Sequence, residues 1–382
     1  MIHFISNLPK DLRSGGFSAM NVAAYSAISS IELTRYVGPI NPPVILTEKV
    51  VSKFKRVAGA QGSFFFYSRR RLNQIADAVH AHTGGDARLD FFHGFTPWIL
   101  TRPDRPYMAW SDCTFHDYIG SFHRREQFRS GDLERIEQAE AAWLNRARFV
   151  IFTSRWAADR AISHYRLDAN RVASVGIFGE IEMPVRDAYD GGLEFAFVST
   201  NFHAKGGPTV LSAFREVRKA HPRASLVIIG DVPSDLAAEP GVRFTGFLRK
   251  EIPAEYQRLL EILGRARALV HPTKSDIAPL LLVEAGYLGC PVISSRKFGI
   301  PELVKDGHTG LLLDDPSQAA TVADAMRRML EHTDDYRKMR SAAWSNARTL
   351  HSRGKFEERL QACVREDLAG ERLATQRTVA AP

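Results

Sequence analysis

The sequence of 382 residues is poor in cysteine and has no long apolar run. Its three cysteines, Cys113, Cys290 and Cys363, are too few and too widely spaced for a disulfide framework or a cysteine-based metal site, which predicts a reducing compartment. No stretch approaches the roughly 18 apolar residues of a membrane-spanning helix, and the opening MIHFISNLPKDL lacks the basic start and apolar middle of a signal peptide. We therefore expect a soluble, cytoplasmic protein.

Motifs for nucleic-acid or metal binding are also lacking. The formal net charge is +8, and residues 1–180 hold 23 Lys and Arg against 17 Asp and Glu. The basic clusters at 51–59, 68–74 and 122–129 come without an aromatic-interleaved RNA motif, zinc-ligand spacing or a basic zipper, so we expect no nucleic-acid partner. They fit solvated helix faces, or contact with an anionic acceptor or an anionic membrane surface. No Asp-x-Asp motif stands at an expected strand end, and we expect neither a metal nor a cofactor.

What the sequence does contain is the pattern of two α/β domains. The length suits two domains of ordinary size, and a hydrophobic content of 45% is enough for two cores. Strand and helix patterns alternate in both halves, which predicts parallel sheets covered by helices. We expect domains at 1–181 and 193–354, separated by a polar, Pro- and Gly-containing linker at 182–192. A final helix at 355–370 is expected to pack back on the first domain.

The stretch from 271 to 314 carries the strongest signal of chemistry. Its order is a strand at 268–272, a loop, a helix at 278–288 and a strand at 291–295. In an open parallel sheet the loop after a strand lies at the carboxyl end, where ligands bind, so residues 275–279 should line a crevice. Asp276 in the loop and Glu284 in the helix can reach different parts of one elongated ligand. Backbone amides at the start of the helix could bind an anionic part of the same ligand, between the two carboxylates.

The same stretch resembles a known signature. Asp276 is followed after seven residues by Glu284, then by Gly289-Cys-Pro-Val292 and Gly299-Ile-Pro-Glu-Leu-Val304. This pattern resembles the nucleotide-sugar signature of retaining glycosyltransferases of the GT-B fold, the glycogen-synthase and sucrose-synthase-like group known as glycosyltransferase family 4. Family members usually have glutamate where this chain has Asp276. The resemblance implies that Glu284 binds the ribose hydroxyls and that Asp276 binds a hydroxyl of the donor sugar, with further donor contacts from Ile277, Ala278, Leu280 and Leu281.

The resemblance also implies an architecture. The expected fold is α/β, with two Rossmann-like, doubly wound parallel-sheet domains facing each other across a cleft. The domain at 1–181 would bind the acceptor, and the domain at 193–354 would bind the nucleotide sugar.

The start of the second half supplies a candidate phosphate-binding residue. Lys205 lies between a strand and a helix, next to two glycines, and a flexible ammonium there suits a diphosphate. Family members have an Arg five residues earlier, where this chain has Thr200, so Asn201 or His203 could replace the missing cation. By resemblance the nucleotide base would meet the backbone of Gly246, Phe247 and Leu248.

Several positions in the first half belong to the expected crevice. Gly15 and Gly16 stand at a strand-to-helix turn, where the backbone can approach the donor phosphates closely. His93 ends one expected strand and Asp112 ends the next. Family members often have histidine at the position of Asp112, and an ionised Asp can accept from a sugar hydroxyl but cannot donate a proton. His93 and His116 are acceptor-side candidates or satisfied structural histidines.

The sequence therefore predicts a retaining, metal-independent glycosyltransferase. The donor would be a UDP-, GDP- or ADP-sugar, with Lys205, Asp276 and Asp112 as the catalytic groups and stabilisation of the leaving diphosphate as the main task. The acceptor would be a glycan, a lipid-linked molecule or a small molecule. One alternative is an epimerase of the same fold that acts on the nucleotide sugar. Another is a non-catalytic nucleotide-sugar-binding protein, motivated by Thr200, Asp276 and Asp112.

Overall fold

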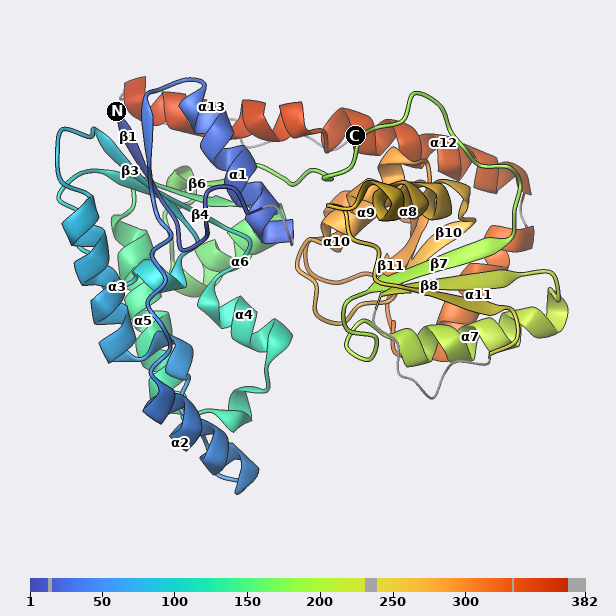
Figure 1. Ribbon diagram of the computed structural model, residues 1–382, viewed down its shortest axis with the longest axis horizontal. Coiled ribbons are helices and arrows are strands. Elements are labelled where there is room, and N and C mark those ends of the chain that lie inside the picture. The colour runs from blue at the N-terminus through green and yellow to red at the C-terminus, as the bar shows by residue number, and fades with distance from the viewer. Residues whose placement is uncertain (13–15, 231–238, 332, 370–382) are drawn as a thin grey trace. The chain divides into compact units, whose positions relative to one another are not determined.

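The computed structural model describes residues 1–12, 16–230, 239–331 and 333–369. The chain divides into two units, each built on one sheet (Figure 1). Unit 1 consists of Met1–Ile177 together with Arg353–Pro382, and unit 2 is Phe178–Ser352. The boundary lies slightly before the expected one, and residues 182–192 belong to unit 2 because Asp187 forms a bidentate ion pair with Arg340.

Unit 1 contains a six-stranded parallel sheet in the order β2-β1-β3-β4-β5-β6. Its strands are β1 (Ile2–Ile5), β2 (Thr34–Val37), β3 (Leu89–His93), β4 (Tyr107–Ser111), β5 (Phe149–Phe152) and β6 (Val172–Ser174). Its helices are α1 (Gly16–Ser29), α2 (Leu46–Val57), α3 (Arg69–His82), α4 (Phe115–Phe122), α5 (Ser130–Arg146), α6 (Arg155–Tyr165) and α13 (Arg353–Ala369), with short 3-10 turns at η1 (Phe65–Tyr67), η2 (Thr96–Trp98), η3 (Arg125–Gln127) and η4 (Ala169–Arg171).

The central strands of unit 1 are buried along their whole length. Every residue of β3, β4 and β5 is buried, which is the pattern of parallel strands covered by helices on both faces. Large rings from strands and helices meet in the core, and the centroids of Phe92 and Trp143 are 5.2 Å apart. Because all strands are parallel, their carboxyl ends lie at one edge of the sheet.

The last helix belongs to the first unit. The ring of Phe356 in α13 lies 5.6 Å from that of Trp110 in β4. The Gln361 side-chain amide donates to the carbonyl of Ala27 in α1 at 3.1 Å. Leu360 and Val364 of the same helix are fully buried. These contacts attach α13 to the sheet and to α1.

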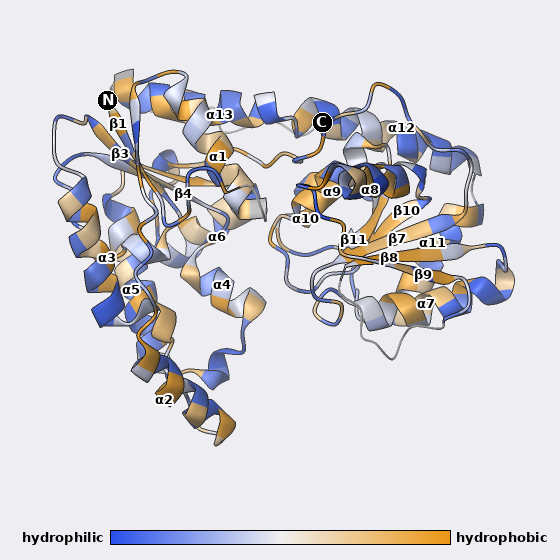
Figure 2. Cartoon of the chain, in the orientation of Figure 1, coloured by the Kyte–Doolittle hydropathy of each residue, from blue (hydrophilic) through white to orange (hydrophobic). Residues whose placement is uncertain are grey.

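Unit 2 repeats the plan with the strand order β12-β11-β10-β7-β8-β9, and its strands are largely hydrophobic (Figure 2). The strands are β7 (Glu194–Ser199), β8 (Ser225–Gly230), β9 (Val242–Gly246), β10 (Ala268–His271), β11 (Val292–Ser295) and β12 (Gly310–Leu313). The helices are α7 (Gly207–Ala220), α8 (Pro253–Arg265), α9 (Leu280–Tyr287), α10 (Ile300–Leu303), α11 (Ala319–Glu331) and α12 (Thr333–Leu350). None of the helices in the described residues is long and apolar enough to cross a membrane.

Both sheets contain a point where the direction of chain progression reverses. In unit 2 the chain runs from β7 outward to β8 and β9, then returns to β10 on the other side of β7. In open parallel sheets, ligands bind beyond the carboxyl ends of the strands at such a point. In unit 1 the equivalent point lies between β1 and β3. The candidate residues Lys205 and Asp276 follow the two strands at the reversal of unit 2.

Local structure decides several element boundaries, and α9 begins two residues later than expected. β2 begins at Thr34, because the chain first completes the turn after α1, where the Glu32 amide donates to the Ile28 carbonyl. β9 ends at Gly246, whose φ of 71° is incompatible with continued strand structure. α9 begins at Leu280, since Pro279 is the N-cap residue with extended backbone.

Candidate functional site

The loop between β7 and α7 holds Lys205 in a turn made by its own backbone. The Asn201 side-chain oxygen accepts from the Ala204 amide at 3.1 Å, and the Lys205 amide donates to the Asn201 carbonyl at 3.1 Å. Gly206 has a φ of 87°, and a Cβ there would lie 3.0 Å from the Pro272 carbonyl oxygen. This position therefore requires glycine, and its close approach joins the β7 loop to the end of β10.

The start of α7 offers fewer free amides than the sequence suggests. The Gly207 amide donates to the Phe202 carbonyl at 2.8 Å, and Pro208 has no N–H. Lys205 is therefore the group from this loop that can provide positive charge to an anion. Thr200, Asn201 and His203 are exposed. The Asn201 side-chain oxygen serves the turn, which leaves its NH2 group and the His203 imidazole as the candidate substitutes for the missing arginine.

Asp276 lies in the loop after β10 and forms an ion pair with Lys205. Its second oxygen is 3.0 Å from His271 Nε2. Burial alone would raise the pKa of the Asp276 carboxyl, but the hydrogen bonds and charges of His271 and Lys205 outweigh it and hold the pKa well below its usual value. The carboxylate is ionised at neutral pH and about one-fifth exposed, so it can accept hydrogen bonds from a ligand.

Glu284 lies in α9 and forms a separate ion pair with Lys250, which follows β9. The Glu284 side chain is 3% exposed, and it also accepts from the Glu180 amide at 2.9 Å. The neighbouring Gly179 amide donates to the Tyr287 hydroxyl at 3.0 Å. Segment 179–180 is thus fixed on α9, and the Glu284 carboxylate is oriented by one backbone and one side-chain donor.

The remaining donor-side residues surround these two pairs at the same edge of the sheet. Gly246 ends β9, Phe247 is 54% exposed and Leu248 is partly buried. Ile277 is buried, and its carbonyl accepts from the Gly299 amide at 2.9 Å, which connects the donor loop to the Gly-Ile-Pro segment. Ala278, Leu280 and Leu281 are partly exposed at the start of α9. The first amides of a helix have no partner within it, so those of Leu280 and Leu281 point toward any anion there.

In unit 1, His93 ends β3 but does not face a crevice as expected. Its imidazole is fully buried among the rings of Phe17 at 4.3 Å and Trp110 at 5.1 Å. Neither ring nitrogen has a hydrogen-bond partner among the described residues, and burial lowers the pKa of His93 to about 3. His93 is therefore neutral at physiological pH and forms part of the aromatic core. Gly15 lies outside the described residues, and Gly16 begins α1.

Asp112 directly follows β4, at the same edge as His93. Its carboxyl accepts from the Ser111 hydroxyl at 3.3 Å, and burial raises its pKa. The loop then turns into α4, where the Thr114 side chain caps the helix by accepting from the Asp117 amide. Asp112 is thus held at the carboxyl edge of the sheet, where a ligand of unit 1 is expected.

His116 in α4 belongs to a polar cluster on the helices. Its Nδ1 lies 3.1 Å from Glu137 in α5, and its ring stacks on His164 in α6 with centroids 3.5 Å apart. These three side chains have the spacing of metal ligands. However, Arg125 donates to the same Glu137 oxygen at 2.7 Å. The guanidinium already supplies the positive charge of this cluster, so we assign no metal to it.

Comparison with known proteins identifies the family. A family model described as glycosyl transferases group 1 matches residues 180–346. D-inositol 3-phosphate glycosyltransferase of Corynebacterium efficiens is 30% identical over 322 residues, which span 77% of this chain and 72% of that protein. The chain belongs to the glycosyl transferases group 1 family. It is therefore a glycosyltransferase, as the sequence signature predicted.

Solved structures share the fold of this glycosyltransferase. Sucrose-phosphate synthase from Thermosynechococcus elongatus superimposes with a TM-score of 0.69 at 18% identity, covering 97% of this chain and 99% of that one. HepE of Anabaena, solved in complex with UDP-glucose, superimposes with a TM-score of 0.63 at 15% identity, covering 96% and 100%. The predicted α/β fold with two Rossmann-like units, as in GT-B enzymes, is confirmed.

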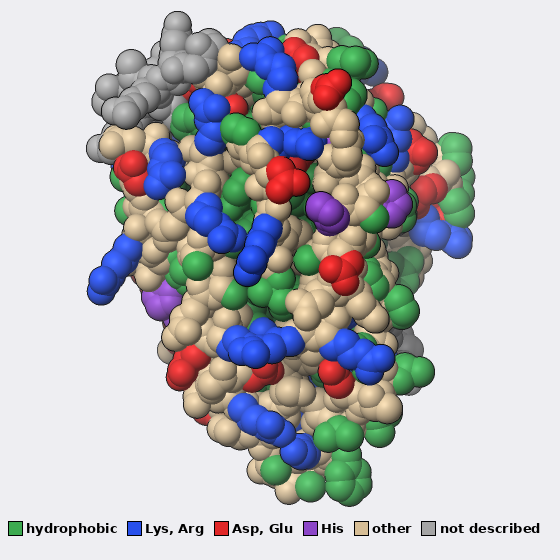
Figure 3. All heavy atoms as spheres, turned by 90° about the vertical axis from the view of Figure 1, so that its left-hand side faces the viewer, with side chains coloured by type: hydrophobic (Ala, Val, Ile, Leu, Met, Phe, Trp, Pro, Cys, Tyr) green, Lys and Arg blue, Asp and Glu red, His purple; other side chains and the backbone are tan. Residues whose placement is uncertain are grey.

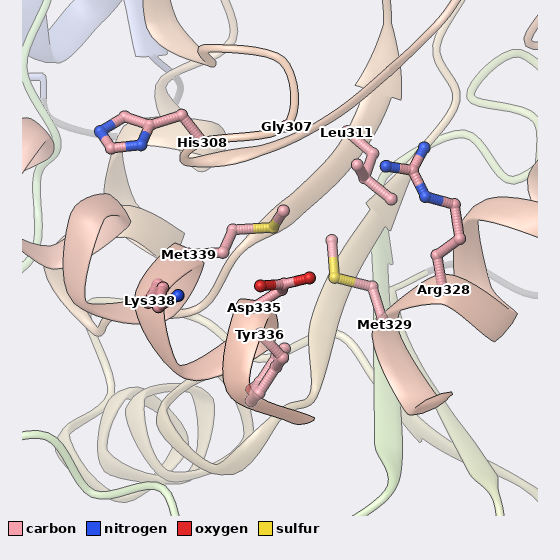
Figure 4. Close-up of a pocket in the computed structure, with 9 residues that line it drawn as sticks. All are labelled: Gly307, His308, Leu311, Arg328, Met329, Asp335, Tyr336, Lys338 and Met339. Atoms are coloured by element: carbon pink, nitrogen blue, oxygen red, sulfur yellow. The ribbon is translucent and has the colours of Figure 1, made fainter. Parts of the chain in front are cut away.

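Each unit of the glycosyltransferase contains a hollow, one at the carboxyl ends of its strands and the other at the amino-terminal edge of its sheet. In unit 1 a cavity of about 310 Å³ lies beyond the carboxyl ends of β1, β2 and β3, lined among others by Asn7, Asn41, Arg71 and Pro97. In unit 2 a hollow of about 260 Å³ lies where Met329, Met339 and Asp335 point toward one another (Figure 4). Gly307 and His308 line the second hollow just before β12, so it opens at the amino-terminal edge of the sheet. It is therefore separate from the Lys205 and Glu284 loops.

Two residues of the glycosyltransferase that position its candidate site residues were not predicted from the sequence. Lys250 lies two residues after Leu248 in the loop that follows β9. Its place at the carboxyl end of a strand could have marked it as a site residue. Glu140 in α5 is fully buried and accepts from the Thr96 hydroxyl, the Phe115 amide and the Tyr165 hydroxyl. It lies on the apolar stripe of α5 with Leu133 and Ile136, and a carboxyl on such a stripe was the signal.

Proposed function

We propose that this glycosyltransferase is a retaining, metal-independent enzyme that moves a sugar from a nucleotide-diphosphate sugar to an acceptor held mainly by unit 1. The observation that carries the proposal is the pair of acid–lysine contacts, Asp276 with Lys205 and Glu284 with Lys250, on loops and a helix at the carboxyl edge of the unit 2 sheet. Each pair offers both signs of charge to a ligand that itself carries hydroxyls and phosphates.

The lysine and carboxylate of the first pair would take different parts of the donor. Lys205 would bind the diphosphate, whose negative charge grows as the bond to the sugar breaks. Asp276 would accept a hydrogen bond from a sugar hydroxyl and remain ionised, which agrees with its lowered pKa. The amides of Leu280 and Leu281 would support the same phosphates. With Thr200 in place of an arginine, Lys205 would carry a larger part of this stabilisation.

The second pair would hold the nucleoside. Glu284 would accept from the ribose hydroxyls, and Lys250 would hold that carboxylate in place. The backbone of Gly246, Phe247 and Leu248 would contact the base, with the exposed Phe247 ring available for stacking. The UDP-glucose complex of the structural relative HepE makes a UDP-sugar the first donor to test.

Retention of configuration would need no protein nucleophile. The acceptor oxygen would form its bond to the anomeric carbon on the face from which the diphosphate leaves, and the acceptor proton would pass to the departing phosphate oxygen. Asp112 would accept from a hydroxyl of the acceptor or of the transferred sugar. His93 and His116 would not contact the substrate themselves, since His93 is buried and His116 is bonded to Glu137. They would instead help to position the side chains around them.

The cavity of unit 1 supports placing the acceptor there. Arg71 lines it, and its guanidinium donates to the Pro42 and Phe66 carbonyls and to the Asn41 side chain. A guanidinium has five N–H groups, so two remain for a ligand. A glycan or lipid-linked acceptor with hydroxyl or phosphate groups suits this lining. We further propose a cytoplasmic location, with peripheral contact to an anionic membrane surface through the basic first unit.

The function can be tested with the purified chain and a panel of UDP-, GDP- and ADP-sugars. We expect one donor to bind and to be hydrolysed slowly without added metal, and mass spectrometry with candidate acceptors to show transfer. NMR should then show a product with the anomeric configuration of the donor. Inverted product would contradict retention. Interconversion of the nucleotide sugar without transfer would identify an epimerase, and binding without any turnover would identify a non-catalytic protein.

The role of Glu284 gives a direct prediction. Glu284→Ala removes the acceptor of the ribose hydroxyls, and hydrogen bonds to a charged group contribute about 1.5–3 kcal/mol, so nucleoside diphosphate affinity should fall about tenfold to a hundredfold. Isothermal titration calorimetry measures this change. Glu216→Ala is the control, because that glutamate pairs with Lys219 on the exposed surface of α7. Unchanged affinity in a folded Glu284→Ala protein would refute the assigned role.

A further inference from the structure

Helix α2 of unit 1 presents an apolar surface to solvent. Its sequence, LTEKVVSKFKRV, contains five large apolar side chains that are more than half exposed. These are Leu46 at 71%, Val50 at 64%, Val51 at 53%, Phe54 at 74% and Val57 at 89%. A contiguous apolar patch of this kind is unusual on a protein that meets only water.

The polar side of α2, rather than its apolar side, attaches the helix to the protein. Ser52 is the buried residue of α2, and its hydroxyl donates to the Ser63 carbonyl at 2.7 Å. The Arg56 guanidinium lies over the Phe128 ring at 5.4 Å. At 3.6 residues per turn, Ser52 points away from the stripe formed by Leu46, Val50, Phe54 and Val57. The usual orientation of an amphipathic helix is therefore inverted, and the apolar stripe faces outward.

Exposed aromatic side chains are also present on neighbouring elements of unit 1. Phe66 in η1 is 47% exposed, and Tyr118 and Phe122 in α4 are 37% and 41% exposed. They are connected through Phe64, whose ring lies 6.1 Å from Phe66 and 6.4 Å from Tyr118. We call Leu46, Val50, Val51, Phe54, Val57, Phe66, Tyr118 and Phe122 the α2 surface.

Positive charge surrounds the α2 surface. Lys49, Lys53, Lys55 and Arg56 lie on α2 itself, against Glu48 alone. The exposed Arg69 and Arg70 begin α3. Figure 3 shows Lys and Arg distributed over this face of unit 1, with hydrophobic side chains gathered at its lower end, where Figure 1 places α2. An apolar stripe flanked by lysines fits the boundary between acyl chains and acidic headgroups.

We propose that α2 is a membrane-docking helix that inserts its apolar stripe into the surface of an anionic lipid bilayer. Lys49 and Lys53 flank the stripe on one side and would contact acidic headgroups, while Lys55 lies beyond the other side. A second copy of the chain fits this surface less well, because it would place these lysines against their own equivalents. The bilayer offers the complementary charge together with the apolar phase.

Docking through α2 would also favour one class of acceptor, an inference that rests on the proposed function. Val44 and Phe66 line the cavity of unit 1, and Val44 precedes α2 by two residues. A docked α2 would therefore hold the cavity close to the headgroup layer. The acceptor class favoured by this arrangement is a molecule carried by a lipid.

Flotation of the full chain with vesicles tests the proposal without any substrate. We expect binding to phosphatidylcholine vesicles that contain phosphatidylglycerol, weaker binding to phosphatidylcholine alone, and a loss of binding at high salt. The double variant Val50→Glu/Phe54→Glu should bind at least about tenfold more weakly. Lys49→Gln/Lys53→Gln should reduce binding to the acidic vesicles and the effect of salt. Hydrolysis of the nucleotide sugar without vesicles should remain as in the wild type, which separates this test from that of the proposed function.

Two control substitutions match the change in exposed apolar surface. Leu33 in unit 1 is 73% exposed and Val185 in unit 2 is 99% exposed, and both lie outside the α2 surface. Leu33→Glu and Val185→Glu should bind vesicles as the wild type does. Absence of wild-type binding to acidic vesicles would overturn the proposal. So would equal losses in the controls, or a dimer in sedimentation that Val50→Glu/Phe54→Glu abolishes.

Discussion

Two buried carboxyl groups show how their neighbours decide the sign of a pKa shift. Asp276 is surrounded by Lys205 and His271, and its pKa is lowered despite burial. Glu140 has only neutral donors as direct partners, and burial dominates, which raises its pKa to about 7. The first carboxylate is suited to binding a ligand in its charged form. The second, which is bonded to the Phe115 amide, is suited to holding the loop after β4.

Glu140 should make stability depend on pH. A carboxyl with a pKa of 4.5 when unfolded and about 7 when folded stabilises the protein fully below pH 4.5 and loses that contribution as the pH rises to 7. The difference corresponds to about 3 kcal/mol. In urea unfolding followed by tryptophan fluorescence, wild-type stability should therefore fall relative to Glu140→Gln by an amount of that order between pH 5 and pH 8.

A second glutamate provides the control for this pH dependence. Arg249 lowers the pKa of Glu255 to about 2, so Glu255 does not titrate between pH 5 and pH 8. The difference between wild type and Glu255→Gln should be the same at both values. A constant difference for Glu140→Gln as well would contradict the raised pKa.

At the residue level, the sequence indicates where a residue lies when its neighbours in the chain determine its place. Lys205 beside two glycines and Asp276 after a strand were both predictable, and the structure joins them. The partner of Glu284 was not, because Lys250 lies 34 residues away and only the neighbouring strand ends bring the two together. The burial of His93 depends on Phe17 and Trp110 from other elements, so its place at a strand end was misleading.

Among the elements, the loop between β7 and α7 depends on close packing at Gly207 as well as at Gly206. A Cβ at Gly207 would lie 2.3 Å from the Phe202 ring, which is buried. Gly207→Ala should displace this ring and with it the turn that positions Lys205. We expect a loss of stability of about 1–3 kcal/mol, as for overpacked cores, and weaker binding of nucleoside diphosphate in calorimetry.

The matched control for Gly207→Ala is Gly131→Ala. Gly131 lies in the first turn of α5, and a Cβ there meets nothing within 4 Å. That variant should bind nucleotide as the wild type does and should be equally or more stable. Wild-type affinity in Gly207→Ala would show that the packing of Phe202 does not position Lys205.

Helix α2 marks the limit of sequence reasoning at the level of elements. The basic cluster at 51–59 fits a solvated helix face, and the structure has a helix from Leu46 to Val57. Its periodicity also shows that one side is apolar, which ordinarily implies that this side is buried. The opposite orientation follows from Ser52, Ser63 and Phe128, contacts that no local pattern contains.

At the level of the whole molecule, unit 1 is assembled from both ends of the sequence. Phe356, Leu360 and Val364 of α13 are buried in it. A variant ending at Ser352 should therefore lose several kcal/mol of unit 1 stability, since each such side chain contributes about 1.5–3 kcal/mol when buried. Four of the five tryptophans, Trp98, Trp110, Trp143 and Trp156, belong to unit 1, so fluorescence during urea unfolding measures this effect.

A chain ending at residue 369 is the control for this truncation. It keeps all of α13 and should unfold as the wild type does. Limited proteolysis of the shorter variant should leave unit 2 resistant while unit 1 is cut. Equal stability of the two truncated chains would contradict the role of α13.

The class of the fold was predictable from the alternation of apolar strands and amphipathic helices in each half. The exact extent of unit 2 was less so, because Asp187 lies in a polar, glycine-containing stretch that reads as a linker. Its ion pair with Arg340 connects residues 153 positions apart and makes that stretch part of unit 2. Composition alone therefore places the boundary only approximately.

The split sequence of unit 1 has a consequence for synthesis on the ribosome. Unit 2 is encoded between the two parts of unit 1, so its whole sheet is synthesised before α13. Unit 1 cannot complete its core until α13 has been made, so its folding must finish after the sequence of unit 2 has been synthesised.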